Sequence, residues 1–373
     1  MGTIIDIGPR GFGVLALFSE PIRLGDAIDR LEREHAQSTD FAPILNVLNM
    51  LIEESALVSP KPERAPTSGW ADPVEHARML YDERRTGDYL AALAAAVRPD
   101  DVVLDIGTGS GVLALAAARA GARSVYAVEA SDIAEVAERV FVLNGVRDQV
   151  TLLPGWSRVI ELPEQADLLV AEVIGNEPLE EEILETMLDA RRRLLKPGAR
   201  MIPHALTLLV RPVLLPEAEV RQRTFGGSAV ERWRTLYGID FTPLLEAAIP
   251  GPTHTITEGE VVATWPPVGP PVELARIDLT TFAEPSVQAS TDLVVEPPGQ
   301  VNGIALTFRA ELYQSYSHTL DPWTWPASSW ATSVWVLSDP IEVGADSVLR
   351  VEYHRRIPGV LDGLTWELLD RRE

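Results

Sequence analysis

The sequence contains no cysteine among its 373 residues. Disulfide bonds and thiolate zinc sites are therefore excluded, and the absence fits a cytoplasmic protein. No apolar stretch approaches the roughly 20 residues of a membrane-spanning helix. The first residues also lack the basic start and small-residue cleavage site of a signal peptide. The six histidines are scattered, with no pair at metal-ligand spacing. We therefore expect a cytoplasmic protein with no bound metal and no membrane association.

Basic residues are scarce relative to acidic ones, 32 against 55, which gives a net charge of −23. Such a surface repels phosphates, so nucleic acid is disfavoured as a direct partner. The same charge would attract a cationic substrate. An acidic surface also keeps many soluble proteins apart, and that simpler explanation stays open.

The chain is longer than a typical single domain, and 46% of its residues are hydrophobic, enough for a sizeable core. Residues 1–60 contain two amphipathic patterns, Leu24–His35 and Pro43–Leu57, which predict an N-terminal helical extension. The Pro-rich, polar stretch Ser59–Gly69 is typical of a linker.

From residue 61 to residue 203, short β-rich runs alternate with helical stretches, which predicts a parallel α/β sheet of the Rossmann type. The β-rich runs are Val102–Asp105, Ser124–Glu129, Gln149–Leu153 and Asp167–Glu172, and the helical stretches include Leu90–Val97, Val112–Ala122 and Ile133–Gly145. Residues 204–373 contain more proline and alternating patterns, which predict an antiparallel β-barrel domain. Its expected strands are Gly259–Trp265, Glu273–Phe282, Gly303–Leu312, Ser333–Leu337 and Ser347–His354.

A glycine-rich turn follows the first of these β-rich runs and opens a helix. Asp105 ends the strand, and Gly107, Gly109 and Gly111 let the backbone approach a ligand closely. The D-x-G-x-G-x-G pattern and the carboxylate of Glu129, which can bind both ribose hydroxyls, favour S-adenosylmethionine as the ligand. A dinucleotide enzyme or a tight turn without a ligand are the alternatives.

From Trp70 to its C-terminus, the chain resembles the protein arginine methyltransferase family. The stretch His76–Thr86 is similar to the family's cofactor-covering helix. The resemblance implies that Arg85 binds the carboxylate of the cofactor's methionine part, with Met79 near the sulfonium and His76 beside the cofactor. An amphipathic helix with solvated charges is the alternative interpretation of this stretch.

The family's second hallmark is a loop with two glutamates that hold the substrate guanidinium. Glu172 and Glu181 have the family's spacing and are the expected catalytic pair. Two carboxylates can draw positive charge away from the reacting nitrogen and aim it at the methyl group. Alternatively, the acidic residues from Glu177 to Glu182 are the first turn of a helix predicted over Leu179–Leu195, where the helix dipole favours them.

The resemblance also assigns Ala130, Ser157 and Glu172 to the cofactor site and Trp330 to the substrate site. Departures from the family accompany these matches, and the aromatic pair of its N-terminal helix is reduced to Trp70. Ser329 stands where the family has a histidine, so a proton relay or hydrogen-bond brace from that residue is expected to be absent. Trp156–Arg158 replaces an acidic pair on the adenine side.

The stretch Trp233–Phe241 is similar to the family's dimerisation arm, expected near residues 212–250. A Trp/Leu/Tyr/Phe cluster in such an arm predicts a homodimer, although ordinary core packing would also explain it. We expect methylation of a guanidino nitrogen of free L-arginine in natural-product biosynthesis, because residues 1–60 precede the covering helix and would roof the pocket. Arginine in a protein or peptide, a small-molecule O- or N-methyltransferase, and a catalytically silent scaffold are the alternatives.

Overall fold

The computed structural model describes residues 69–248, 251–295, 297–345, 347–355 and 363–370. They belong to the unit Pro66–Glu373. The helices predicted within residues 1–60, and all of the predicted linker except Gly69, lie outside the described residues. No helix within the described ranges is long and apolar enough to cross a membrane.

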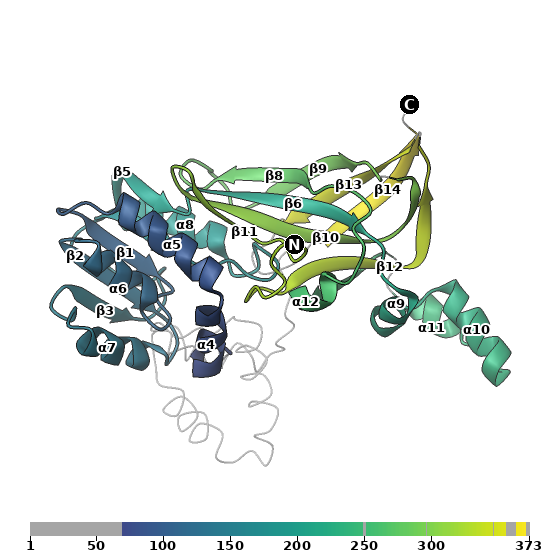
Figure 1. Ribbon diagram of the computed structural model, residues 1–373, viewed down its shortest axis with the longest axis horizontal. Coiled ribbons are helices and arrows are strands. Elements are labelled where there is room, and N and C mark those ends of the chain that lie inside the picture. The colour runs from purple at the N-terminus through teal and green to yellow at the C-terminus, as the bar shows by residue number, and fades with distance from the viewer. Residues whose placement is uncertain (1–68, 249–250, 296, 346, 356–362, 371–373) are drawn as a thin grey trace, which may run out of the picture. The chain divides into compact units, whose positions relative to one another are not determined.

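A five-stranded parallel sheet forms the first part of the fold, as the alternating pattern predicted (Figure 1). Its strands are β1 (Val102–Ile106), β2 (Ser124–Glu129), β3 (Val150–Pro154), β4 (Ala166–Ala171) and β5 (Leu195–Ile202). The helices of this part are η1 (Gly69–Ala71), α4 (Pro73–Tyr81), α5 (Glu83–Ala96), α6 (Val112–Arg119), α7 (Ala134–Leu143) and α8 (Ile183–Arg193). The spatial order is β3-β2-β1-β4-β5, so the strand order reverses between β1 and β4. Open α/β sheets bind ligands at such a reversal, outside the carboxyl ends of the strands.

The sequence explains why these strands lie in the middle of the protein. All five residues of β1 are buried, and β4 is buried at five of its six positions, as expected for parallel strands covered on both faces. The α6 helix presents only small side chains and one leucine as its buried face: Leu113, Ala114, Ala117 and Ala118. The register pairs Ile106 with both Val128 and Ala171, so three strand ends meet at one edge of the sheet.

The second part of the fold is an antiparallel β-rich domain, as predicted. One sheet has the order β7-β12-β10-β6-β8 with β11 paired to β10, and another has the order β14-β13-β9. The strands of the first sheet are β6 (Ala205–Val213), β7 (Thr253–Thr257), β8 (Val272–Asp278), β10 (Gly299–Tyr313), β11 (Tyr316–Thr319) and β12 (Thr332–Val343). Those of the second are β9 (Val287–Leu293), β13 (Ser347–Arg355) and β14 (Gly363–Asp370). Between β6 and β7, the helices α9 (Glu217–Arg223), α10 (Gly227–Tyr237) and α11 (Thr242–Ala247) lead away from the sheets (Figure 1).

The strand predicted at Gly259–Trp265 is wrong, because this segment begins with the short helix α12 (Gly259–Val262). The Glu258 carbonyl accepts hydrogen bonds from the backbone N–H groups of Val261 and Val262, which starts the helical turn. Val262 and Trp265 are both buried, and their spacing of three residues fits one face of a helical turn rather than of a strand.

The helix predicted at Leu179–Leu195 is shorter than expected, because α8 begins only at Ile183. Glu182 has a φ of +57°, in the left-handed region, which breaks the helix on its N-terminal side. Glu181 therefore lies in a turn before the helix. This geometry contradicts the alternative in which the acidic residues from Glu177 to Glu182 form the first turn of α8.

Candidate active site

The glycine turn after β1 has the backbone conformation that its sequence requires. Gly107, Gly109 and Gly111 have φ values of +76°, +55° and +91°, which other residues adopt only with strain. A Cβ atom on Gly109 would lie 2.9 Å from the His76 ring, and one on Gly111 would lie 2.6 Å from the Phe141 ring. The turn therefore depends on glycine both for its conformation and for space.

Two buried carboxylates flank this turn. Thr108 donates its hydroxyl to Asp105 Oδ2 at 2.5 Å, whereas Asp105 Oδ1 has no partner among the described residues. Burial raises the pKa of Asp105 to about 7. Glu129 accepts hydrogen bonds from the backbone N–H groups of Gly109 (2.9 Å) and Ser131 (2.8 Å), which holds its carboxylate against the turn.

These features fit S-adenosylmethionine. The unpaired Asp105 oxygen is a buried acceptor that the ammonium of a bound amino acid part could satisfy. A carboxylate has about four acceptor positions, so Glu129 keeps capacity for ribose hydroxyls beyond its two backbone bonds. Ala130 directly follows β2, and Ser157 comes three residues after β3, at the same edge of the sheet. Among the described residues, no group of three or more His, Asp or Glu side chains is arranged to hold a metal ion.

The stretch predicted as one covering helix is two helices, with a break at Asp82. The Asp82 carboxylate accepts a hydrogen bond from Arg85 N at 3.0 Å and so caps α5. His76 on α4 is buried, and its Nε2 lies 2.8 Å from the Trp70 carbonyl oxygen. The ring of His76 lies against Gly109, in the turn that is expected to bind the cofactor.

Arg85 lies at the centre of the site. Its guanidinium forms an ion pair with Glu172, lies 5.1 Å from the centre of the Trp330 ring, and lies 3.6 Å from Met79 Sδ. The side chains of Arg85 and Glu172 are only 11% and 9% exposed. Burial lowers the pKa of Arg85, although Tyr89, Asp82 and Glu181 nearby act to raise it. The structure thus brings together all of these predicted residues from distant parts of the sequence.

Glu181 differs from Glu172 because its carboxylate has no hydrogen-bond or ion-pair partner among the described residues. Burial and repulsion from Glu180 raise the pKa of Glu181 to about 7, although Arg85 acts to lower it. A partly buried carboxylate of this kind favours a cationic ligand, because a guanidinium would supply the missing partner.

Sequence reasoning missed the role of Asp82. Its carboxylate also accepts hydrogen bonds from Ser329 N (2.8 Å), Ser328 Oγ (3.2 Å) and Trp325 Nε1 (3.2 Å). Burial acts to raise the pKa of Asp82, but the hydrogen bonds from Arg85, Ser329 and Ser328 hold it below its ordinary value. At Ser329, where the resemblance places a histidine in the family, the contact with Asp82 therefore comes from the backbone N–H.

Trp330 was predicted to contact the substrate, and most of its surface is occupied by the protein itself. It is 6% exposed, and its Nε1 donates to the Ile174 carbonyl at 2.6 Å. Its ring packs against Phe308 and against His318. His318 is buried and also lies 2.9 Å from Asp88 Oδ2, a contact between β11 and α5 that no sequence pattern indicated.

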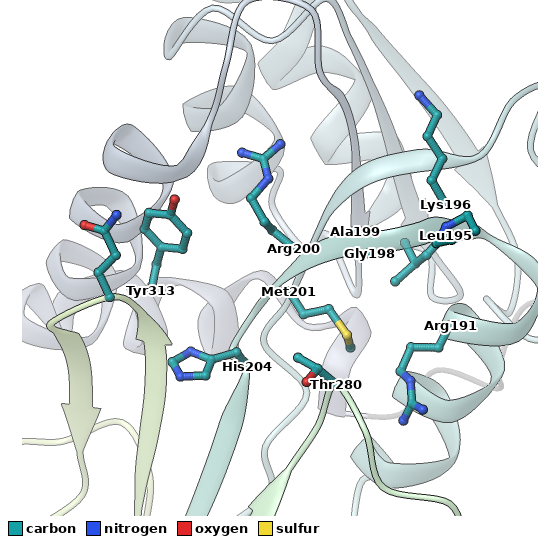
Figure 2. Close-up of a pocket in the computed structure, with 12 residues that line it drawn as sticks. Arg191, Leu195, Lys196, Gly198, Ala199, Arg200, Met201, His204, Thr280 and Tyr313 are labelled. Atoms are coloured by element: carbon teal, nitrogen blue, oxygen red, sulfur yellow. The ribbon is translucent and has the colours of Figure 1, made fainter.

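A separate pocket lies where the end of α8, β5 and the turn between β10 and β11 meet (Figure 2). The charged residues that line it are basic: Arg191, Lys196 and Arg200, with His204 beside them. Figure 2 shows Arg191 and Arg200 pointing in opposite directions. Arg200 donates to Asp101, Lys196 to Asp167, and Arg191 to two backbone carbonyls. These cations connect elements of the fold and do not converge on one ligand position.

The chain is similar in sequence to known methyltransferases. The family model described as ribosomal protein L11 methyltransferase (PrmA) matches residues 85–205. The chain is 30% identical over 298 residues to the probable protein arginine N-methyltransferase 6 of Arabidopsis thaliana, covering 75% of this chain and 66% of that protein. It is 33% identical over 291 residues to a probable histone-arginine methyltransferase CARM1 of Oryza sativa subsp. indica, covering 74% and 53%. The chain thus spans less than two thirds of the length of these curated relatives.

Solved structures agree with the fold. The Arabidopsis thaliana protein arginine methyltransferase 10 matches with a TM-score of 0.67 at 24% identity, covering 81% of this chain and 95% of that one. The Trypanosoma brucei PRMT1 enzyme–prozyme complex with AdoHcy matches with a TM-score of 0.64 at 24% identity, covering 81% and 99%.

The parallel sheet, the glycine turn and the acidic residue at the end of β2 define a class I S-adenosylmethionine-dependent methyltransferase fold. The antiparallel domain behind it and the sequence similarity narrow the assignment further. The chain belongs to the protein arginine methyltransferase family.

Proposed function

We propose that this chain is an S-adenosylmethionine-dependent N-methyltransferase that modifies a guanidino nitrogen of arginine within a protein or peptide. The observation that carries the proposal is the partly buried Glu181 carboxylate, which lacks a partner among the described residues and lies near Arg85, the ion-pair partner of Glu172. This arrangement supports a cationic, planar acceptor that two carboxylates can bind from different sides.

The proposed roles follow from the contacts. Bound S-adenosylmethionine would supply a methyl group on a positively charged sulfur, and transfer breaks the S–C bond, forms an N–C bond and releases a guanidino proton. Arg85 would bind the carboxylate of the cofactor's methionine part, which competes with Glu172 for the same guanidinium. Glu172 would then be released from Arg85 and, with Glu181, hold and orient the acceptor. We therefore expect the cofactor to bind before the acceptor.

The choice of acceptor rests on the relatives. Those reported above are named as protein arginine or histone-arginine methyltransferases. They favour arginine in a protein over the free L-arginine, and over the natural-product role, that the sequence led us to expect. The net charge of −23 is consistent with attraction of an arginine-rich, cationic peptide.

The acceptor assay separates these possibilities. The enzyme would be incubated with methyl-labelled cofactor and either an arginine-rich peptide, its lysine-substituted counterpart, or free L-arginine. We expect label in the arginine peptide and none in the lysine peptide. Methylation of free arginine with an unlabelled peptide would contradict the proposal and restore the free-arginine hypothesis.

We also propose that the chain forms a homodimer through the helical segment between β6 and β7. Leu236, Tyr237 and Ile239 are 59%, 63% and 52% exposed, which is unusual for apolar side chains so close together. Trp233 instead packs against Phe225 and Phe241, so part of the predicted arm is a small local core. One solved relative is a heterotetrameric complex. The predicted contribution of residues 1–60 to the interface falls outside the described residues.

A further inference from the structure

The loop that carries the two glutamates is held by the β-rich domain. Three hydrogen bonds reach it: Trp330 Nε1 to the Ile174 carbonyl (2.6 Å), Ala331 N to Asn176 Oδ1 (2.8 Å) and Tyr353 Oη to Glu177 Oε1 (2.6 Å). The first two come from the segment just before β12. The third comes from β13, in the other antiparallel sheet. Its acceptor is the buried carboxylate of Glu177.

Glu177 is only 1% exposed, yet both of its carboxylate oxygens are paired. Oε1 accepts from the Tyr353 hydroxyl, and Oε2 accepts from Leu179 N at 2.9 Å. Burial raises the pKa of Glu177, whereas these two hydrogen bonds act to lower it. Leaving a buried carboxylate without its donors is costly, so the loop is strongly tied to the position of Tyr353.

A second buried contact lies two residues further along β13. Arg355 forms a two-point ion pair with Glu185 on α8, at 3.1 and 3.2 Å, and the side chains are 3% and 9% exposed. Residues two apart in a strand point to the same face, so Tyr353 and Arg355 act from one side of β13. Their partners, Glu177 and Glu185, lie four residues before and four residues after Glu181.

We propose that Tyr353 and Arg355 are positioning residues that hold Glu181 at the acceptor by fixing the chain on both sides of it. This inference rests on the proposed function, because it assigns to β13 the placement of the acceptor carboxylate. Glu181 itself has no partner among the described residues, so its location depends on the anchors that flank it.

Single substitutions test the role in the reaction. We expect Tyr353→Phe and Arg355→Gln each to lower kcat on an arginine peptide by about tenfold or more, since small misplacements of reacting groups cost up to about a hundredfold. The KM for S-adenosylmethionine should stay unchanged, because neither residue lies at the glycine turn. Glu177→Gln keeps one oxygen that can accept from Tyr353 but loses the bond from Leu179 N, so its activity should lie between those of the wild type and Glu177→Ala.

Two matched controls remove the same groups elsewhere. Tyr313→Phe removes a hydroxyl at the end of β10, in the pocket of Figure 2. Arg350→Gln removes an arginine on β13 that pairs with Asp292 on β9. Both controls should have wild-type kcat. If they lose as much activity as Tyr353→Phe and Arg355→Gln, the effect is general loss of stability and the proposal is wrong.

Hydrogen exchange gives a measurement that does not depend on the substrate. Amides of residues 172–185 should exchange faster in Tyr353→Phe than in the wild type, while those of residues 102–118 stay unchanged. Unchanged exchange in residues 172–185 would refute the anchor, and faster exchange with normal kcat would refute its role in the reaction. A wild-type enzyme that methylates no guanidino compound would refute the proposed function, and the exchange result would still decide whether the anchor exists.

Discussion

Replacing Glu181 by glutamine should remove activity and stabilise the fold at the same time. Burial raises the pKa of Glu181 from an ordinary 4.5 to about 7. Because one pKa unit corresponds to about 1.4 kcal/mol, ionising this carboxylate costs the folded state up to about 3 kcal/mol. Water reaches part of the side chain and screens it, so we expect a cost of about 1–2 kcal/mol.

The sign of this effect depends on pH. Below about 4.5 the carboxyl is protonated in both the folded and the unfolded state, so the wild type and Glu181→Gln should be equally stable. Between 4.5 and about 7 the unfolded state releases its proton while the folded state keeps it, and the wild type loses stability as pH rises. Above pH 7 the variant should therefore unfold at a temperature higher by a few degrees.

Glu181→Gln should be less active than the wild type, although it should be more stable above pH 7. The amide cannot attract or polarise the guanidinium as a carboxylate does, so we expect methyl transfer to fall by about 10²–10³-fold. Affinity for S-adenosylmethionine, measured by calorimetry, should not change. Glu217→Gln, an exposed glutamate on α9, is the control and should leave both stability and activity as they are. A Glu181→Gln enzyme that is fully active, or that is less stable than the wild type at pH 8, would refute the reasoning.

Other parts of the structure lead to further expectations. At low acceptor concentration, methyl transfer should rise with pH through about 7, because only ionised Glu181 attracts the cation, and a flat profile would argue against this role. Glu129→Ala should weaken S-adenosylmethionine binding by about tenfold or more in a calorimetric titration, since it removes a buried acceptor beside the turn. Gly111→Ala should lower the free energy of unfolding by about 2–4 kcal/mol, because the new Cβ is strained and meets the Phe141 ring. Leu236→Glu should convert a dimer to a monomer in light scattering, and a monomeric wild type would contradict the assembly proposal.

Several features were predictable because they depend on local sequence. The β1 strand, the glycine turn and the residues Asp105 and Glu129 follow from a buried apolar run that meets obligatory glycines. The positive φ values of Gly107, Gly109 and Gly111 confirm why glycine occupies these positions. The segment Gly259–Trp265 was predicted wrongly, because a short apolar run can alternate like a strand and still bury residues three apart on a helical turn.

The pairing of Arg85 with Glu172 could not be derived from spacing, since 87 residues separate them in the sequence. The resemblance named both residues, but only the register of β1 and β4 shows how close the end of β4 comes to the glycine turn. The contacts of Asp82 with Trp325, Ser328 and Ser329 were also not predicted, because these donors lie more than 240 residues further along the chain.

The sequence by itself determined the fold class, the cofactor turn and the spacing of Glu172 and Glu181, because strand periodicity and glycine placement are properties of a local stretch of chain. Only the tertiary structure decided where Glu181 lies and what surrounds it. It lies in a turn rather than in a helix, and it is flanked by Glu177 and Glu185, which β13 holds through Tyr353 and Arg355. The reason is that the buried carboxylates of Glu177 and Glu185 require hydrogen-bond donors. Those donors come from β13, about 170 residues further along the chain.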